Sequence, residues 1–200
     1  TEVLPVSLIE RREILDETWS LSNQGKGTCV GHPIPGVEIK IIEISDQPIL
    51  KWQDITESGT NIVGEIAVKA EWATRTYFNR KDLTQLAKIE DGNSFWHRMG
   101  DLGRLDEKNR LWFYGRKNQR VVTEFETLYT IPCEAIFNQH PDVKRSALVG
   151  TGYKTKPVII IEPVERIKSQ AARQKFTAEL LERGAKSSLT QSITKVLFHE

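Results

Sequence analysis

Two polar segments, close together in the sequence, carry side chains that can bind a sugar or a phosphate. In the run from Arg98 to Gly103 (RMGDLG), Asp101 follows a predicted strand and is flanked by glycines. A carboxylate on such a turn can accept two hydrogen bonds from a sugar diol, and the glycines let backbone and ligand approach closely. Read alone, the segment is more typical of a structural aspartate in a turn between two strands.

The second segment, Gly115-Arg116-Lys117-Asn118, closes the next predicted strand. An arginine beside a glycine at a strand end can reach a phosphate or a ribose. Alone, this run too is more typical of a solvated basic turn. The two runs are not isolated, however, because an acid-bearing turn, a hairpin, an aromatic strand and Gly-Arg follow one another in order. That combination favours a binding site over two unrelated turns.

The elements that position these residues are predicted from periodicity and turn chemistry. Residues 95–99 and 110–114 are strand-like, and Asp106-Glu107-Lys108-Asn109 between them predicts a hairpin. Upstream, an irregular polar segment at 1–30 precedes predicted strands at 37–42 and 64–69 and a helix at 81–89. Downstream, the sequence predicts a strand seed at 121–122, a helix at 132–139, strands at 143–150 and 158–163, a helix at 167–181 stopped by Gly184, and a strand at 193–198. This change of character places a boundary near Lys117-Asn118.

Composition and charge argue against several classes of protein. The net charge is +1 and no basic stripe alternates with aromatics, so nucleic acid is a poor candidate partner. The longest apolar runs, such as 158–161, are too short to span a bilayer. No early stretch combines basic residues with a following apolar core, so we expect no secretion signal. Cys29 and Cys133 lack metal-binding spacing, so we expect reduced thiols in a cytoplasmic protein.

Four segments in order resemble the adenylate-forming (AMP-binding) superfamily, which holds acyl-CoA synthetases, fatty-acid AMP ligases, firefly luciferase and the adenylation domains of peptide synthetases. The run from Phe95 to Arg116, FWHRMGDLGRLDEKNRLWFYGR, is similar to the W-x-x-T-G-D-x-G … F-x-G-R signature of that superfamily. The other three segments are VGHPIPGVEIKII, GEIAVKAEWATRTYFNR and EAIFNQHPDVKRSALVG. Together the four cover most of residues 28–150.

The resemblance implies roles for five positions. Asp101 matches the aspartate that binds both ribose hydroxyls of ATP, and Arg116 matches the arginine that contacts ribose or phosphate. Asn118 stands at the hinge about which the C-terminal domain swings. Thr1 and Glu2 match the end of a Y-G-x-T-E motif, where the threonine contacts the α-phosphate and the glutamate holds Mg²⁺. The implied cofactors are therefore ATP (with AMP as product) and Mg²⁺.

The resemblance places two catalytic parts outside the 200 residues. The family's phosphate loop precedes its Y-G-x-T-E motif, and its catalytic lysine lies near the C-terminus, here beyond Glu200. We therefore expect no catalytic residue within the chain, a truncation at both ends, and no activity from the chain alone. Positioned cations and backbone NH groups are the main catalytic resource for such a transfer.

The expected fold is mixed α/β (α+β). Residues 1–117 should form a distorted β-barrel subdomain, the C-terminal part of the large AMP-binding domain, and residues 118–200 an incomplete, small α+β swinging domain. The implied reaction converts a carboxylic acid, taken as a fatty acid, and ATP to acyl-AMP and pyrophosphate, and then transfers the acyl group.

The acyl acceptor stays open between CoA and an intramolecular hydroxyl. The segment after residue 118 lacks the glycine of the family's K-I-R-G loop, which speaks against CoA. Residues 129–134 (YTIPCE) resemble family members that adenylate a β-hydroxy fatty acid and close it to a β-lactone. The competing class is a non-catalytic nucleotide-binding or interaction module that reuses the fold.

Overall fold

The structure is a computed structural model, and it describes residues 2–152 and 155–199. The chain divides into two compact units. Unit 1 holds the residues up to Asp16 together with Thr28–Lys117, and unit 2 holds Glu17–Gly27 together with the residues from Asn118 onward.

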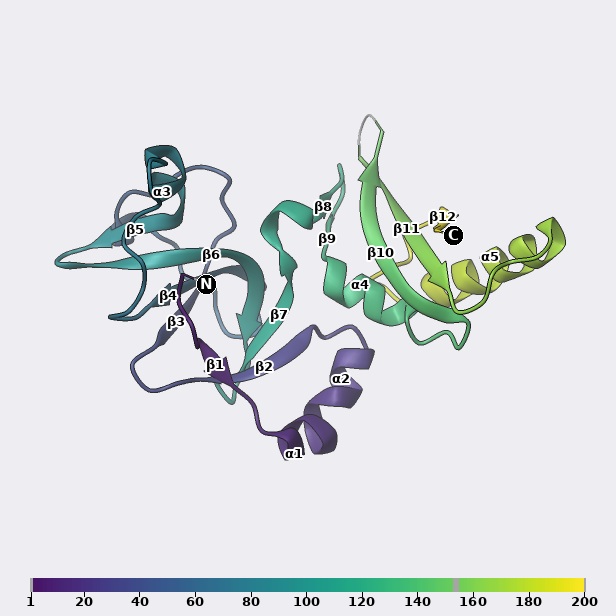
Figure 1. Cartoon of the computed structure of the whole chain (residues 1–200), viewed down its shortest axis with the longest axis horizontal. Helices are drawn as coiled ribbons and strands as arrows, with labels where there is room; N and C mark the ends of the chain where they lie inside the picture. The colour runs from purple at the N-terminus through teal and green to yellow at the C-terminus, as the bar shows by residue number, and fades with distance from the viewer. Residues whose placement is uncertain (1, 153–154, 200) are drawn as a thin grey trace. The chain divides into compact units, whose positions relative to one another are not determined.

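Unit 1 is built around a curled, antiparallel, seven-stranded sheet (Figure 1). The strand order is β1-β2-β7-β6-β4-β3, and β5 pairs with β6 in addition. The described part of the chain shows no pairing between β1 and β3, so the curled sheet is an open half-barrel. Its strands are β1 (Ser7–Leu8), β2 (Thr28–Pro33), β3 (Glu38–Ile42), β4 (Gly64–Lys69), β5 (Lys88–Asp91), β6 (Ser94–Leu105) and β7 (Leu111–Arg116).

Alternating β-branched residues create the core of unit 1. Ile39 and Ile41 of β3 and Ile66 and Val68 of β4 are each less than 10% exposed and pack into one apolar cluster. These strands pair antiparallel, with Ile39 opposite Val68 and Ile41 opposite Ile66, so side chains of period two meet on one face. A short helix, α3 (Lys81–Ala87), precedes β5.

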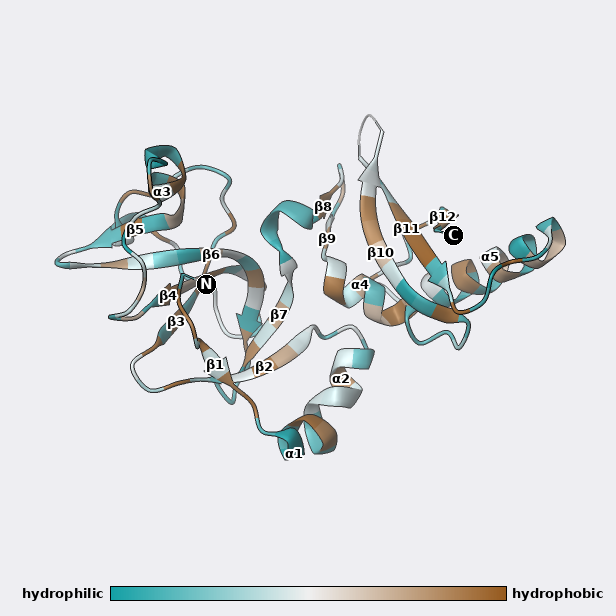
Figure 2. Ribbon diagram, in the orientation of Figure 1, coloured by the Kyte–Doolittle hydropathy of each residue, from teal (hydrophilic) through white to brown (hydrophobic). Residues whose placement is uncertain are grey.

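Unit 2 is a small α+β unit with a three-stranded sheet of order β10-β11-β12. Strands β10 and β11 are antiparallel, and β12 is parallel to β11. Figure 2 shows apolar segments along β10 and β11, and helices α4 and α5 supply Phe137, Phe176 and Leu180 to the same core. The elements are α2 (Trp19–Asn23), β8 (Val121–Val122), β9 (Thr127–Leu128), α4 (Thr130–Phe137), β10 (Val143–Thr151), β11 (Lys156–Pro163), α5 (Gln170–Ala185) and β12 (Val196–Phe198).

The expectation of a mixed α/β chain, with a curled β part followed by a smaller α+β part, is confirmed. The irregular segment predicted at 1–30 is wrong over 11–23, where α1 (Arg11–Glu13), a π-helical turn (Ile14–Thr18) and α2 follow one another. Residues 17–27 were predicted to belong to the first part, 1–117, but in the structure they belong to unit 2. The reason is packing, because Thr18 is buried and Gly25 lies against Leu189 and Pro132.

Several element boundaries also differ from the prediction, and three of them have a clear physical reason or affect the candidate site. Helix α3 stops at Ala87 rather than continuing to 89, because the next residues pair with β6 as strand β5. Helix α5 runs past the predicted stop at Gly184, which is buried inside the helix and faces the ring of Phe137. Strand β6 continues through Asp101, so this aspartate lies within a strand and not on a turn between two strands.

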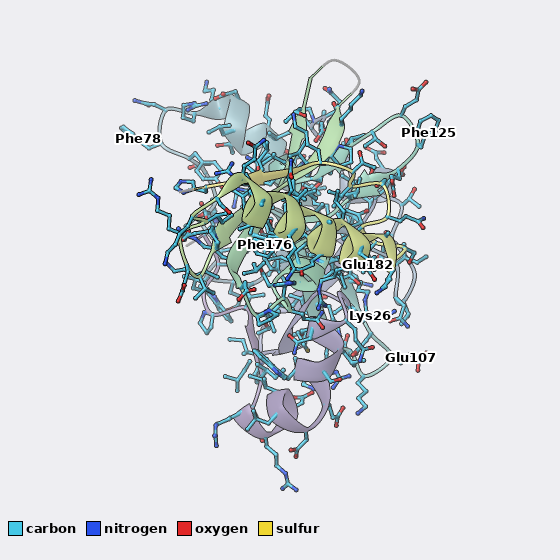
Figure 3. All side chains as sticks on the ribbon, turned by 90° about the vertical axis from the view of Figure 1, so that its right-hand side faces the viewer. Lys26, Phe78, Glu107, Phe125, Phe176 and Glu182 are labelled. Carbon is cyan, nitrogen blue, oxygen red and sulfur yellow. The ribbon has the colours of Figure 1, made fainter. Side chains whose placement is uncertain are left out.

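Aromatic side chains in the chain lie at both extremes of exposure (Figure 3). Phe176 is 8% exposed, whereas Phe78 in unit 1 and Phe125 in unit 2 are both 90% exposed. Phe125 stands at the tip of the β8–β9 hairpin, whose turn is fixed by hydrogen bonds from the backbone N–H groups of residues 125 and 126 to the Thr123 hydroxyl. No helix among the described residues has both the length and the apolarity that crossing a membrane requires.

Candidate functional site

The two residues first singled out in the sequence, Asp101 and Arg116, are brought together in unit 1. They are direct cross-strand partners on β6 and β7. Arg116 Nη1 lies 2.9 Å from Asp101 Oδ1 as an ion pair. The Arg116 side chain is 59% exposed whereas the Asp101 side chain is 17% exposed. The pair therefore presents a half-sheltered carboxylate beside a solvent-accessible guanidinium.

A bulge in β6 places Asp101 where it is. Glu65 and Ala67 of β4 pair with Leu102 and Arg98 of β6, so β6 has two more residues between these pairs than β4 has. Gly100, inside this bulge, has a φ of +68° and open space around its missing side chain. The glycine is thus required by its left-handed backbone conformation and not by a close neighbour.

The electrostatics of Asp101 fit a ligand that donates hydrogen bonds. Burial raises the pKa of the Asp101 carboxyl above its ordinary value, and the nearby Arg116 guanidinium opposes that shift. Asp101 Oδ1 is buried, and the Arg116 guanidinium that lies 2.9 Å away is its ion-pair partner, although the contact does not meet hydrogen-bond geometry. A carboxylate has two oxygens and can accept several hydrogen bonds. The hydroxyls of a bound sugar can therefore donate to Asp101 in addition to its ion pair with Arg116.

Glu2 lies in the same unit, near a tyrosine and a lysine. Tyr77 Oη donates a hydrogen bond to Glu2 Oε1 at 3.3 Å, and the backbone oxygen of Glu2 accepts one from Thr74 N at 3.0 Å. Burial lowers the pKa of Lys88 to about 8, and the Glu2 carboxylate opposes this. Within the described residues no group of three or more His, Cys, Asp or Glu side chains could hold a metal ion. Mg²⁺ commonly uses one or two carboxylates plus substrate phosphates, which a single Glu2 suits.

The remaining predicted positions are placed as follows. Asn118 is exposed, lies in the 3₁₀ turn Lys117–Gln119, and is the first residue of unit 2 after the boundary. Thr1 lies outside the described residues. Cys29 and Cys133 are both buried free thiols, and burial raises the pKa of Cys133 to about 12, so this thiol is unreactive.

A buried cluster of charges, two of which lie near Asp101 and Arg116 in the sequence, was not predicted from the sequence. Glu65 of β4 is 1% exposed at its side chain and binds Arg98 of β6 and Lys117, the residue after Arg116. No local pattern could have revealed this cluster, because its members lie 33 and 52 positions apart in the sequence.

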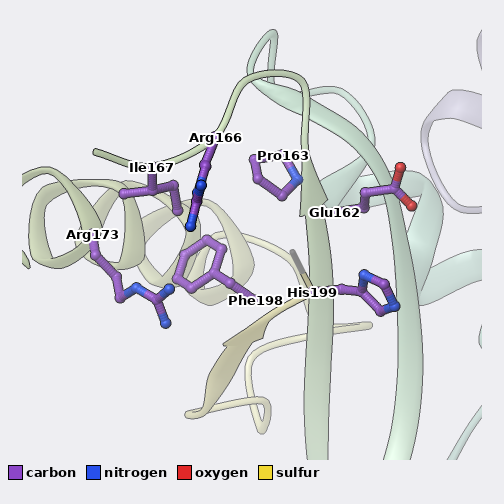
Figure 4. A pocket seen from close by; sticks show the side chains of 7 residues that line it. All are labelled: Glu162, Pro163, Arg166, Ile167, Arg173, Phe198 and His199. Atoms are coloured by element: carbon purple, nitrogen blue, oxygen red, sulfur yellow. The ribbon is translucent and has the colours of Figure 1, made fainter. Parts of the chain in front are cut away.

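A cavity of about 450 Å³ lies within unit 2 (Figure 4). In its wall, the guanidinium of Arg173 stands over the ring of Phe198 at 5.3 Å. The cavity contains none of the predicted site residues. Its lining residues are Glu162, Pro163, Arg166, Ile167, Arg173, Phe198 and His199.

The chain is similar in sequence to curated proteins of known name. The whole chain is 42% identical over 206 aligned residues to an olefin β-lactone synthetase of Xanthomonas campestris, of which it covers 37%. It is 44% identical to an olefin β-lactone synthetase of Stenotrophomonas maltophilia, over 81% of this chain and 30% of that protein. The chain thus spans about a third of the length of these relatives. No family model matches the sequence.

Solved structures share the fold. An o-succinylbenzoate CoA synthetase from Bacillus subtilis, solved with an acyl-adenylate intermediate, superposes with a TM-score of 0.72 at 19% identity, over 97% of this chain and 34% of that one. An amide bond synthetase from Marinactinospora thermotolerans gives a TM-score of 0.69 at 22% identity, over 94% of this chain and 33% of that one.

The resemblance to the adenylate-forming superfamily is confirmed by these curated relatives, and the solved structures share its fold. Both olefin β-lactone synthetases are more than 40% identical to this chain, whereas a 2-succinylbenzoate–CoA ligase of Arabidopsis thaliana is 28% identical over 70% of this chain and 23% of its own length.

Proposed function

We propose that the protein containing this chain activates a carboxylic acid with ATP, forming an acyl-adenylate and pyrophosphate. One observation carries the proposal: Asp101 presents a largely buried carboxylate directly across the sheet from the exposed guanidinium of Arg116, with which it forms an ion pair at 2.9 Å. In the proposed complex, the ribose hydroxyls donate to Asp101, and Arg116 contacts the ribose or the adjacent phosphate. Charge-assisted hydrogen bonds of this kind contribute about 1.5–3 kcal/mol each.

Glu2 and Thr1 are proposed to act on the phosphates. Mg²⁺ would neutralise phosphate charge as pyrophosphate leaves. In this proposal Glu2 supplies a carboxylate ligand to the ion and Thr1 contacts the α-phosphate. The hydrogen bond from Tyr77 to Glu2 Oε1 would hold the carboxylate in one orientation.

The proposed substrate is a β-hydroxy fatty acid whose own hydroxyl is the acyl acceptor. The β-hydroxyl oxygen attacks the carbonyl carbon of the acyl-adenylate and loses its proton. A carbon–oxygen bond forms, the bond from the carbonyl carbon to the AMP phosphate oxygen breaks, and the products are a β-lactone and AMP. Support comes from the names of the two olefin β-lactone synthetases, which are 42% and 44% identical to the chain, whereas CoA as acceptor is favoured by the more distant CoA ligases.

The test uses the complete protein with ATP and Mg²⁺, and it measures pyrophosphate and AMP separately. A β-hydroxy fatty acid should release both without CoA, and the corresponding acid without the hydroxyl should release pyrophosphate but retain its acyl-adenylate. Formation of a CoA thioester in place of the lactone would contradict the acceptor alone. Absence of pyrophosphate release with every acid would contradict the activity and favour a non-catalytic binding module.

The chain of 200 residues is itself proposed to be inactive. None of its described residues supplies the family's phosphate loop or catalytic lysine by sequence, so transition-state charge would lack its main stabilising groups. Purified chain should give no pyrophosphate from ATP with any carboxylate. Clear exchange of labelled pyrophosphate into ATP by this chain would show that the missing groups are dispensable.

A further inference from the structure

The most deeply buried charges of unit 1 form one cluster centred on Glu65. Arg98 Nη2 donates to Glu65 Oε2 at 2.7 Å and Arg98 Nε donates to Glu65 Oε1 at 3.2 Å. Lys117 Nζ lies 3.0 Å from Glu65 Oε1. The side chains of Glu65 and Arg98 are each 1% exposed, and that of Lys117 is 13% exposed. One carboxylate therefore holds two cations from different chain segments.

The remaining donors of the cluster bind backbone carbonyls. Arg98 Nη1 donates to the carbonyls of Gln47 and Leu86, at 2.8 and 3.0 Å. Lys117 Nζ donates to the carbonyl of Ser45 at 2.8 Å, and Arg98 Nη2 donates to the same carbonyl. The cluster thus fastens the loop at 45–47 and the end of α3 onto strands β4 and β6.

Each cation is close in sequence to one member of the candidate nucleotide site. Arg98 precedes Asp101 by three residues, at the start of the β6 bulge, and Lys117 directly follows Arg116 at the end of β7. Fixing Arg98 therefore fixes one end of the bulge that carries the carboxylate, and fixing Lys117 fixes the strand end that carries the guanidinium.

Resting on the proposed function, we infer that Glu65 is a positioning residue of the nucleotide site, which acts through Arg98 and Lys117 to hold Asp101 opposite Arg116. The stability of the fold does not explain such a cluster, because a buried ion pair is often no more stabilising than apolar residues of similar volume. A need for fixed geometry explains it, since binding groups must be held by supporting contacts to stay in productive orientation.

The decisive variant is Lys117→Met in the complete protein. It leaves the two hydrogen bonds between Arg98 and Glu65 intact, so the carboxylate keeps a cationic partner and the fold should persist. Freed from Glu65, the end of β7 should let Arg116 leave Asp101. We expect KM for ATP to rise about tenfold while kcat changes less, and Lys117→Arg to restore KM, as a loss of ground-state binding implies.

Lys40→Met is the matched control. It removes another lysine–glutamate pair of the same sheet, Lys40 Nζ to Glu57 Oε2 at 2.8 Å, which is exposed and distant in sequence from Asp101 and Arg116. Its ATP kinetics should equal those of the wild type. Amide hydrogen exchange gives a second readout on folded protein, with faster exchange at 115–119 in Lys117→Met and no change there in Lys40→Met. Lys117→Gln repeats the test with a polar side chain.

The outcomes separate the two proposals. Lys117→Met with wild-type KM and wild-type exchange would overturn the positioning role. Equal loss in Lys117→Met and Lys117→Arg would overturn it as well, because the charge would then not be the cause. A wild-type protein that neither binds ATP nor releases pyrophosphate would contradict the proposed function first, and the positioning role with it.

Discussion

The two units bury different kinds of groups. Among the described residues, four acidic, basic or histidine side chains are buried, and all four belong to unit 1: Glu65, His97, Arg98 and Arg110. The buried polar side chains of unit 2 are three threonines, Thr18, Thr130 and Thr190. Unit 2 otherwise excludes water with an apolar cluster of helix and strand residues.

This difference separates stability from function. An apolar core gains free energy roughly in proportion to the area it removes from water, and it needs no particular partner. Buried charges need partners at fixed distances, and they gain less net stability. The Asp101–Arg116 pair lies in the unit that accepts this cost, beside Glu65 and Arg98. In the proposed function, the fixed charges of unit 1 bind a polar ligand, whereas unit 2 is built on an apolar core.

The largest expected effect is a loss of stability when the apolar core of unit 2 is truncated. Phe137 is 0% exposed, and its ring lies against Gly184 of α5. Phe137→Ala should destabilise unit 2 by about 4 kcal/mol, through lost burial and the cavity left behind. Amide hydrogen exchange should show protection lost across 118–199. Phe125→Ala, which changes a phenylalanine that is 90% exposed in the same unit, should alter stability by less than about 0.5 kcal/mol.

The second expected effect is a loss of stability when the buried charges of unit 1 lose their shared carboxylate. Glu65→Gln leaves Arg98 and Lys117 without their carboxylate, although both keep carbonyl partners. Uncompensated buried charge should destabilise unit 1 by about 3 kcal/mol. Urea unfolding measures the change, and Glu57→Gln is the exposed control, expected to cost about 0.2–1 kcal/mol. Equal effects of the two variants would show that burial of Glu65 adds nothing.

The sequence predicted what depends on local pattern. The strand expected at 64–69 is found at Gly64–Lys69, and the turn expected at 106–109 joins β6 to β7. The helical segment at 11–23 was missed because Glu10 provides no side-chain cap and the segment is rich in polar residues. Gly184 was misjudged because its glycine serves close packing: a Cβ there would lie 3.0 Å from the Phe137 ring.

The candidate site divides in the same way. Asp101 and Arg116 could be singled out because both stand in short motifs, and the structure makes them neighbours. Glu65 could not, because it looks like an outward-facing residue of an alternating strand. In the structure β4 is buried over five successive residues, so both of its faces are covered. Partners far away in the sequence then decide whether a charge is exposed or paired.

The third expected effect is a pH dependence of the stability of unit 1, caused by a buried histidine. The side chain of His97 is 2% exposed. Burial, and to a smaller extent the charge of nearby Lys88, lowers the pKa of His97 to about 4. A hydrogen bond from Nδ1–H to the Ala87 carbonyl and the charge of Glu2 oppose this shift. Between about pH 6.5 and 4 the unfolded chain binds a proton that the folded chain does not. The free energy of unfolding should therefore decrease as the pH is lowered across this window, by up to about 3 kcal/mol, and level off below it.

His97→Gln tests this assignment. The variant should lack this part of the pH dependence in urea unfolding followed between pH 4 and 7. His32→Gln, which alters a histidine whose side chain is 49% exposed in the same unit, should keep it. A slope that persists in His97→Gln would assign the lost stability to other groups.

The last prediction concerns Asp101 and separates binding from folding. Because burial raises the pKa of Asp101, the charged carboxylate costs the fold free energy at neutral pH; its stabilising contribution exists at low pH and is lost as pH rises through the folded pKa. Asp101→Asn keeps the shape and removes that cost, so its thermal midpoint at pH 7 should not fall below that of the wild type. Any advantage over the wild type should shrink as pH is lowered.

In the complete protein the same substitution should weaken nucleotide use. It removes the charge and turns one acceptor toward the ribose into a donor, so kcat/KM for ATP should fall about 10²-fold, equivalent to about 2.7 kcal/mol. A structural aspartate would behave in the opposite way, with a lower midpoint and unchanged kinetics of the folded protein. Both quantities are measured on one preparation. An Asn variant with wild-type ATP kinetics would remove Asp101 from the site, and with it the main observation for nucleotide binding by unit 1.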